Sequence, residues 1–120
     1  MATSLDFNMK DASSPANTKI VSLAGEIDES NEEELKNLLE RLFNDADIKY
    51  VVFDLKDLSY MNSRIIGLFL FWFNQFTEDD KNFVLAQAKG SIYDVIEIVG
   101  LSSVVDYFPT VEEACLFLEK

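Results

Sequence analysis

Few side chains in this sequence are suited to catalysis. The chain contains no histidine, which is the commonest general base and a common metal ligand. Its single cysteine, Cys115, lies between Ala114 and Leu116 in the last predicted helix, and we do not expect it to be a nucleophile. The four glycines are scattered, so no glycine-rich loop could cradle a phosphate. These features favour a protein that is not an enzyme, and we expect no cofactor.

Acidic side chains are abundant, and four of them lie near the ends of two predicted strands. They are Glu26, Asp28, Asp54 and Asp57. Carboxylates that converge at the ends of strands could bind a hard cation. However, the chain has 22 acidic and 10 basic residues, for a net charge of −12, so solvated surface carboxylates are the simpler interpretation and we expect no metal site.

The net charge also bears on the class of partner. A charge of −12 repels phosphate backbones and anionic lipids, so we expect neither direct nucleic-acid binding nor membrane binding. It would suit a protein partner with a basic patch. The simpler alternative is that the acids only keep the protein soluble.

Ser63 is the side chain with the clearest chemical potential, because it precedes the most apolar stretch, residues 65–73, with Asn62 before it. Both residues are good helix caps, and the sequence predicts Ser63 as the N-cap. Ile66, three positions on, cannot reach back as a glutamate would, so the first amides of the helix remain available. A phosphate on Ser63 would meet these amides and the positive end of the helix dipole, with Arg64 beside it. The alternative is an ordinary N-cap that contributes ~1 kcal/mol.

Hydrophobic periodicity predicts an α/β fold in which strands and helices alternate after an opening pair of strands. Strands are expected at 5–9, 20–24, 48–55, 82–86 and 104–108, and helices at 30–43, 63–76, 91–99 and 110–118. The predicted N-caps of three of these helices, each with an acidic residue three positions on, are Ser30, Ser91 and Thr110, and Gly100 is the predicted C-terminal cap of the third helix. Residues 56–61 are expected to be a loop. We therefore expect one domain, residues 1–120, with a small mixed sheet of four to five strands and about four helices.

The predicted helix 63–76 is apolar almost all round, which indicates burial or a second partner. Gly67 within it is expected to allow close approach of a neighbouring backbone, because glycine inside a helix otherwise costs ~1 kcal/mol. Phe71, Trp72 and Phe73 belong either to the core of the domain or, if exposed, to an interface.

The expected compartment is the cytoplasm. The N-terminal residues lack the basic and apolar regions of a secretion signal, and the longest apolar run is far shorter than the ~20 residues that span a bilayer. Cys115 alone cannot form an internal disulfide, which suits a reducing compartment.

An ordered set of motifs resembles the STAS domain of bacterial anti-sigma factor antagonists. The set comprises residues 25–28 after a strand, residues 54–55, and residues 58–63 before a helix containing Gly67. The resemblance covers essentially the whole chain in matching element order. At the helix start the family has Met-Asp-Ser-Ser/Thr-Gly-Leu-Gly. The matching run, residues 61–67, shares its Met, its first Ser and its last Gly, and has Asn62, Arg64 and Ile65 at departing positions.

This resemblance implies a non-catalytic regulator that binds an anti-sigma factor, itself a serine kinase, and so frees a sigma factor. It implies Ser63 as the phosphoacceptor, and phosphorylation would switch the protein off by adding roughly −1.5 to −2 charges to the interface. The expected partner-binding residues are Glu26, Asp28, Asn62, Ser63 and Arg64. The alternative is a divergent STAS interaction or scaffold module that is not phosphorylated and is possibly dimeric.

Overall fold

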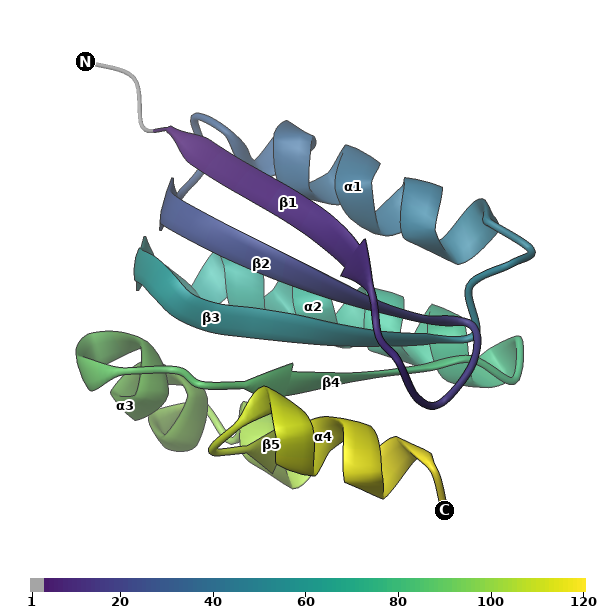
Figure 1. Ribbon diagram of the computed structural model, residues 1–120. Helices are drawn as coiled ribbons and strands as arrows, with labels where there is room; N and C mark the ends of the chain where they lie inside the picture. The colour runs from purple at the N-terminus through teal and green to yellow at the C-terminus, as the bar shows by residue number, and fades with distance from the viewer. Residues whose placement is uncertain (1–3) are drawn as a thin grey trace.

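Strands and helices alternate along the chain after an initial hairpin (Figure 1). The computed structural model describes residues 4–120, so residues 1–3 of the stretch searched for a secretion signal lie outside it. The elements are β1 (Leu5–Asp11), β2 (Thr18–Ile27), α1 (Glu32–Asn44), β3 (Tyr50–Met61), α2 (Ser63–Glu78), β4 (Asn82–Ala86), α3 (Gly90–Ile98), a 3-10 turn (Leu101–Ser103), β5 (Tyr107–Phe108) and α4 (Val111–Leu118). No helix among the described residues is long and apolar enough to cross a membrane.

The five strands form one mixed sheet in the order β1-β2-β3-β4-β5. β1 is antiparallel to β2, and every later pair is parallel. A parallel neighbour requires a crossover connection, which α1, α2 and α3 supply. The predicted α/β fold with a small mixed sheet and four helices is therefore confirmed.

Helices cover the two faces of the sheet unequally. The larger core lies between the sheet and α1, α2 and α3, and its central rings are those of Phe53, Phe69 and Phe83, which meet edge to face. Such aromatic pairs contribute ~0.5–1.5 kcal/mol each beyond the area that they bury. On the other face α4 covers β3 and β4, where Ala114 and Leu118 join a smaller cluster (Figure 1).

β3 continues to Met61, so the prediction of a loop at residues 56–61 is wrong. Leu58 and Met61 are buried and pair with Gly25 and Ile27 of β2. The register of β2 against β3 shifts twice in this segment, so that buried side chains of β3 recur every three residues rather than every two. This spacing does not resemble a strand in the sequence.

Gly25 ties the start of β1 to the end of β2. Its φ is +101°, in a region that favours glycine, and a Cβ at this position would collide with the carbonyl oxygen of Ser4. The next amide, that of Glu26, donates a hydrogen bond to the same oxygen at 3.0 Å. The close approach of the two strands therefore depends on the missing side chain.

The later elements differ from the sequence predictions mainly at their ends. α3 begins at Gly90 with Lys89 as its N-cap, not at Ser91, and the last strand shortens from 104–108 to two residues after the 3-10 turn. Gly100, with a φ of 76°, follows α3 as predicted. Thr110 caps α4 by accepting a hydrogen bond from the Glu113 amide at 3.1 Å, as predicted.

Gly67 does not lie in a close helix contact, and that prediction is wrong. The residue is exposed, and no atom outside its own helix backbone and chain neighbours lies within 4 Å of the place where a Cβ would stand. The packing of α2 on the sheet instead uses Ile65, Phe69 and Phe76, which are almost fully buried.

Candidate functional site

The predicted site residues gather at one end of the sheet, where β2 and β3 end and α1 and α2 begin. Glu26 lies opposite Tyr60 in the register of the two strands, and Asp28 follows the end of β2. Asn62, Ser63 and Arg64 form the start of α2. Because β2 and β3 are parallel neighbours, their carboxyl ends bring the two groups together, as is usual for sites in α/β sheets.

Asn62, not Ser63, is the N-cap of α2. Its Oδ1 accepts a hydrogen bond from the amide of Ile65 at 3.1 Å, which satisfies one of the unpaired amides at the helix start. The prediction that Ser63 caps this helix is therefore wrong. Ser63 occupies the first helical position and its side chain is exposed. The amides of Ser63 and Arg64 precede any acceptor within the helix.

Two side-chain contacts connect the start of α2 with the loop before α1 and with the first residue of α1. Asn62 Nδ2 donates to Glu29 Oε2 at 3.2 Å, and Arg64 Nε lies 2.8 Å from Glu32 Oε1. Arg64 therefore already has a carboxylate partner on α1. A phosphate on Ser63 would compete with that carboxylate for the guanidinium group.

Asn31 organises the loop between β2 and α1, and sequence reasoning missed it. This residue is 4% exposed; its Nδ2 donates to the Glu26 carbonyl at 2.8 Å and its Oδ1 accepts from the Asp28 amide at 3.0 Å. It also stands at the N-cap position of α1, where Ser30 was predicted, although its side chain makes no capping bond. Ser30 Oγ instead donates to Asp28 Oδ1 at 2.6 Å. The Asn beside Ser30 was the available sequence signal, since Asn is as good a cap as Ser.

The electrostatic environment of the site is strongly acidic. The end of β2, the loop after it and the first turn of α1 together carry six carboxylates: Glu26, Asp28, Glu29, Glu32, Glu33 and Glu34. Arg64 is the cation that the start of α2 adds, and it is paired with one of them. Such a surface attracts a partner with a basic patch.

Exposed aromatic side chains border this surface. Tyr60 is 46% exposed on β3 beside Glu26, and sequence reasoning missed it because the sequence predicts a loop over residues 56–61. On α2, Ser63, Gly67 and Phe71 follow one another at four-residue spacing, and Phe71 is 56% exposed. Trp72 lies in the core instead, only 8% exposed.

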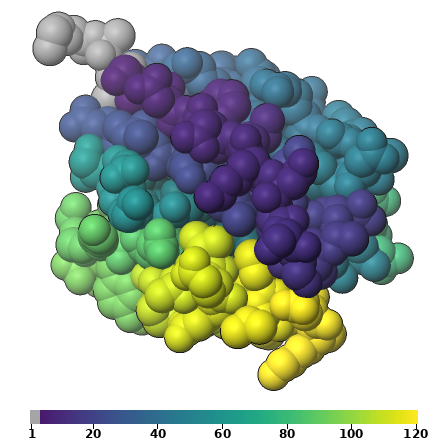
Figure 2. All heavy atoms as spheres, viewed as in Figure 1, coloured from purple at the N-terminus to yellow at the C-terminus, as the bar shows by residue number. Residues whose placement is uncertain are grey.

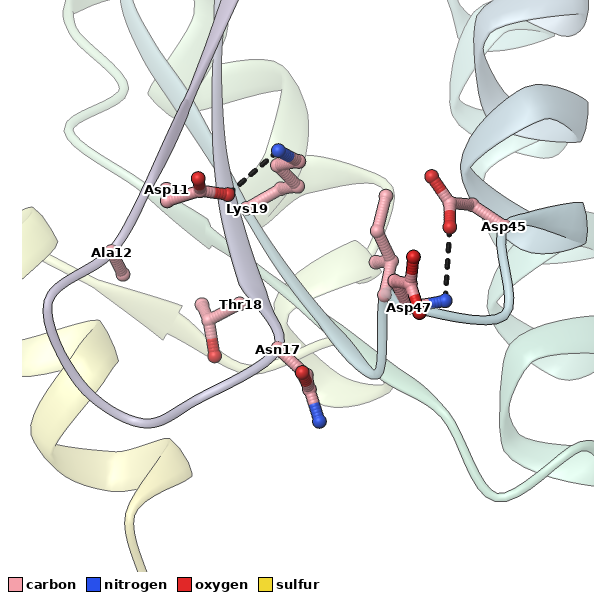
Figure 3. Close-up of a pocket in the computed structure, with 8 residues that line it drawn as sticks. Asp11, Ala12, Asn17, Thr18, Lys19, Asp45 and Asp47 are labelled. Atoms are coloured by element: carbon pink, nitrogen blue, oxygen red, sulfur yellow. Dashed lines mark hydrogen bonds and ion pairs between the residues drawn. The ribbon is translucent and has the colours of Figure 1, made fainter.

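A hollow of about 400 Å³ lies at the opposite end of the sheet, near the start of β2 and the loop after α1 (Figure 3). Lys19 Nζ lies 2.6 Å from Asp11 Oδ1 there, and this hydrogen bond is the main cause that raises the pKa of Lys19. Asp45 Oδ1 accepts from the amide of Asp47 at 2.9 Å. The carboxylates of Asp11 and Asp45 in this hollow are thus engaged with the protein itself.

Residues 4–120 contain no group of three or more histidine, cysteine, aspartate or glutamate side chains that could hold a metal ion. Asp54, one of the four carboxylates considered above, accepts hydrogen bonds from Gln87 Nε2 at 2.9 Å and from the amide of Lys56 at 3.1 Å.

Burial and the neighbouring Glu112 and Glu119 raise the pKa of the Cys115 thiol, which disfavours the nucleophilic thiolate.

This mixed sheet, with an exposed serine at the start of the helix that follows its central strand, defines a small α/β fold. Residues 9–114 match the family model of the STAS domain, and the chain belongs to that family.

Solved structures with this fold include anti-sigma factor antagonists. An anti-sigma factor antagonist from Mycobacterium paratuberculosis is 19% identical, with a TM-score of 0.85 over 98% of this chain and 96% of that chain. The anti-sigma factor antagonist SpoIIAA in its unphosphorylated form is 21% identical, with a TM-score of 0.73 over 94% of this chain and 96% of that chain. The Bacillus cell fate determinant SpoIIAA in its phosphorylated form is 19% identical, with a TM-score of 0.68 over 94% and 99%. At these identities the likeness is one of fold.

Proposed function

We propose that this protein is an anti-sigma factor antagonist that binds an anti-sigma factor of the serine-kinase type and is switched off by phosphorylation of Ser63. The observation that carries the proposal is the place of Ser63, exposed at the first helical position of α2. The proposed binding surface comprises Glu26, Asp28, Asn62, Ser63 and Arg64. The protein itself has no catalytic role in this proposal, and it acts in the cytoplasm as a single domain.

The three departures from the family pattern are compatible with this function. Ile65 is fully buried, so its bulk enlarges the core and does not alter the surface that a partner meets. Asn62 performs the capping role that an aspartate would perform at this position. Arg64 is the one departure that adds an exposed charge, and Glu32 balances it.

Phosphorylation would act on this surface in two ways. A phosphate on Ser63 would lie at the positive end of α2, close to the amides of Ser63 and Arg64, so the modified helix stays folded. In a complex the same phosphate would be buried with about two negative charges, and the loss of its hydration opposes binding. The modification therefore weakens the complex without unfolding the protein.

The test is calorimetric titration of the anti-sigma factor with the parent protein and two variants. Ser63→Ala should bind like the parent and resist phosphorylation by the kinase, because alanine brings no charge into the interface. Ser63→Asp should bind at least tenfold more weakly, a loss of ~1.4 kcal/mol. Ser91→Asp is the matched control: Ser91 is exposed in the first turn of α3, so it adds the same charge to another helix start and should leave the affinity unchanged.

Arg64 provides a second control. Because its guanidinium group could neutralise an adjacent carboxylate, the penalty of Ser63→Asp should grow in an Arg64→Ser background. Equal affinities of the parent, Ser63→Ala and Ser63→Asp proteins would contradict the switch. Circular dichroism checks that each variant is folded.

A STAS interaction or scaffold module without phosphorylation is the second candidate function, and the exposed Phe71 favours it. Aromatic side chains are enriched at the centres of protein interfaces, and Phe71 is more than half exposed on α2. In this case Phe71→Ser should abolish partner binding, while every substitution at Ser63 should leave it unchanged. The same titrations therefore separate the two functions.

A further inference from the structure

β1 is an edge strand that presents a free side to solvent. It pairs with β2 alone, and six of its seven residues are exposed. Figure 2 shows β1 (purple) crossing the surface of the molecule, with no other segment in front of it. An uncovered edge of this length exposes a row of unpaired backbone groups and is a template for another strand.

Two hydrogen bonds reveal which backbone groups of β1 face outward. The Glu26 amide donates to the Ser4 carbonyl, and the Ala12 amide donates to the Thr18 carbonyl, each at 3.0 Å. Backbone groups alternate in direction along an antiparallel pair. The even-numbered residues of β1 are therefore bonded to β2, and the amides and carbonyls of the odd-numbered residues, from Leu5 to Asp11, point toward the free edge.

The side chains of β1 are complementary to those of an antiparallel second copy. Two β1 strands can pair antiparallel with Asn8 of one strand opposite Asn8 of the other. Phe7 of each strand, whose backbone groups face the free edge, then lies opposite Met9 of the other. In the same register Asp6 of each strand lies opposite Lys10 of the other, in the closer, non-hydrogen-bonded type of pair. Centring the pair on Phe7 or on Met9 instead would leave Lys10 without a carboxylate opposite it.

The surface beside β1 also has room for the partner's ring. Phe7 and Met9 are 40% and 36% exposed and lie on the face of the sheet that α1 covers. Met9 lines a hollow of about 190 Å³ with Leu38 and Leu42 of α1. In the register centred on Asn8, the partner's Phe7 would stand directly opposite Met9, next to this hollow.

We propose that β1 is a self-association edge, at which two copies of this chain pair antiparallel about a two-fold axis at Asn8 and join their sheets into one. The proposal is independent of Ser63, which lies at the start of α2. The net charge of −12 on each copy opposes association, so the dimer is weak and reversible and strengthens as salt screens this repulsion.

Sedimentation equilibrium of charge-reversed variants tests the pairing. Asp6→Lys and Lys10→Asp each place like charges opposite one another at two symmetric positions, and each should weaken dimerisation about tenfold or more. Asp6→Lys lowers the net negative charge of the chain, so repulsion between the net charges of the two copies alone would predict stronger dimerisation for this variant. The double variant Asp6→Lys/Lys10→Asp restores opposite charges and should recover the parent dissociation constant.

Amide hydrogen exchange at increasing protein concentration provides a readout that needs no variant. The amides of Phe7 and Met9 should gain protection as dimer forms, while those of Asp6, Asn8 and Lys10 are bonded to β2 and should be protected at every concentration. A parent protein that stays monomeric up to ~1 mM overturns the proposal. The proposal is also overturned if both charge-reversed variants dimerise as tightly as the parent, or if dimerisation protects no odd-numbered amide of β1. In either case another surface forms the dimer.

Discussion

The helices α1 and α2 begin side by side, at the ends of neighbouring parallel strands, yet their first turns are built differently. α1 begins with three glutamates after the buried Asn31, whose side chain turns back to the loop. α2 begins with no acidic residue, and Asn62 caps it from a partly exposed position. The positive end of α1 is thus compensated by carboxylates of its own first turn, whereas the first turn of α2 has none and the neutral side chain of Asn62 caps it.

This difference separates two uses of the same amino acid. Both polar side-chain atoms of Asn31 are hydrogen-bonded to the backbone around the loop after β2, so Asn31 stabilises this loop rather than the helix. Asn62 accepts a hydrogen bond from its own helix through Oδ1 and donates one to Glu29 through Nδ2. It therefore connects the start of α2 to the loop. An anion added at this end of the sheet is therefore accommodated better at α2 than at α1.

The largest expected effect is that of Asn31→Ala. The change leaves the Glu26 carbonyl and the Asp28 amide without their side-chain partner, and such losses at buried sites should lower the free energy of unfolding by about 2–3 kcal/mol. Urea unfolding followed by circular dichroism measures it. Asn37→Ala, an exposed substitution on the same helix, is the control and should stay within ~0.5 kcal/mol of the parent.

The next effect distinguishes Asn62 from Ser63. Asn62→Ala removes the cap of α2 and should cost ~1 kcal/mol of stability. Ser63→Ala removes an exposed hydroxyl that caps nothing and should change stability by less than ~0.5 kcal/mol. Thermal unfolding of both variants decides the comparison. If Ser63→Ala is the more damaging of the two, Ser63 is the cap in solution.

Gly67→Ala should stabilise the protein. The site has open space around it and lies in the helix interior, so alanine gains ~0.5–1 kcal/mol through a smaller loss of backbone entropy. The expectation from the sequence was the reverse, that a larger residue would overpack a close contact. A rise of a few degrees in the melting temperature would support the open space around Gly67. A fall would instead indicate that Gly67 lies in a close contact.

The smallest effect concerns the pair formed by Arg64 and Glu32. Both Glu32→Gln and Arg64→Ser should change stability by less than ~0.5 kcal/mol, because an ion pair whose arginine is exposed to solvent contributes little. Glu32→Gln should nevertheless strengthen the hold of Arg64 on a phosphate at Ser63. In a 31P NMR titration, the stronger contact should appear as a lower second pKa of the phosphoserine. An unchanged pKa would show that Arg64 and the phosphate do not interact.

The core strands could be predicted from sequence because their apolar runs are short and nearly unbroken. The apolar residues of 51–55 and 82–86 are buried in parallel strands as predicted. The end of β3 could not be recognised, because the register shifts space Leu55, Leu58 and Met61 three residues apart. Strand pairing with β2, which no local pattern encodes, decides their conformation.

The place where the candidate site residues gather could be predicted, but their contacts could not. The sequence identified the segments that meet, because strand-to-helix junctions in α/β sheets share one edge. It misassigned both caps, because Ser30 with Glu33 and the lone Ser63 fit local capping patterns. The actual choices depend on contacts with distant segments, such as the bond from Asn62 to Glu29, 33 positions earlier.

The two register shifts in β3 also bear on how such a protein could evolve. They divide the strand into a core segment, which must stay aligned with β2 and β4, and a terminal segment, which has already absorbed extra residues. An insertion or deletion in the terminal segment would move Ser63 relative to the neighbouring loop while the aromatic core kept its alignment. Partner specificity could therefore change through the length of one strand, separately from the selection that preserves folding.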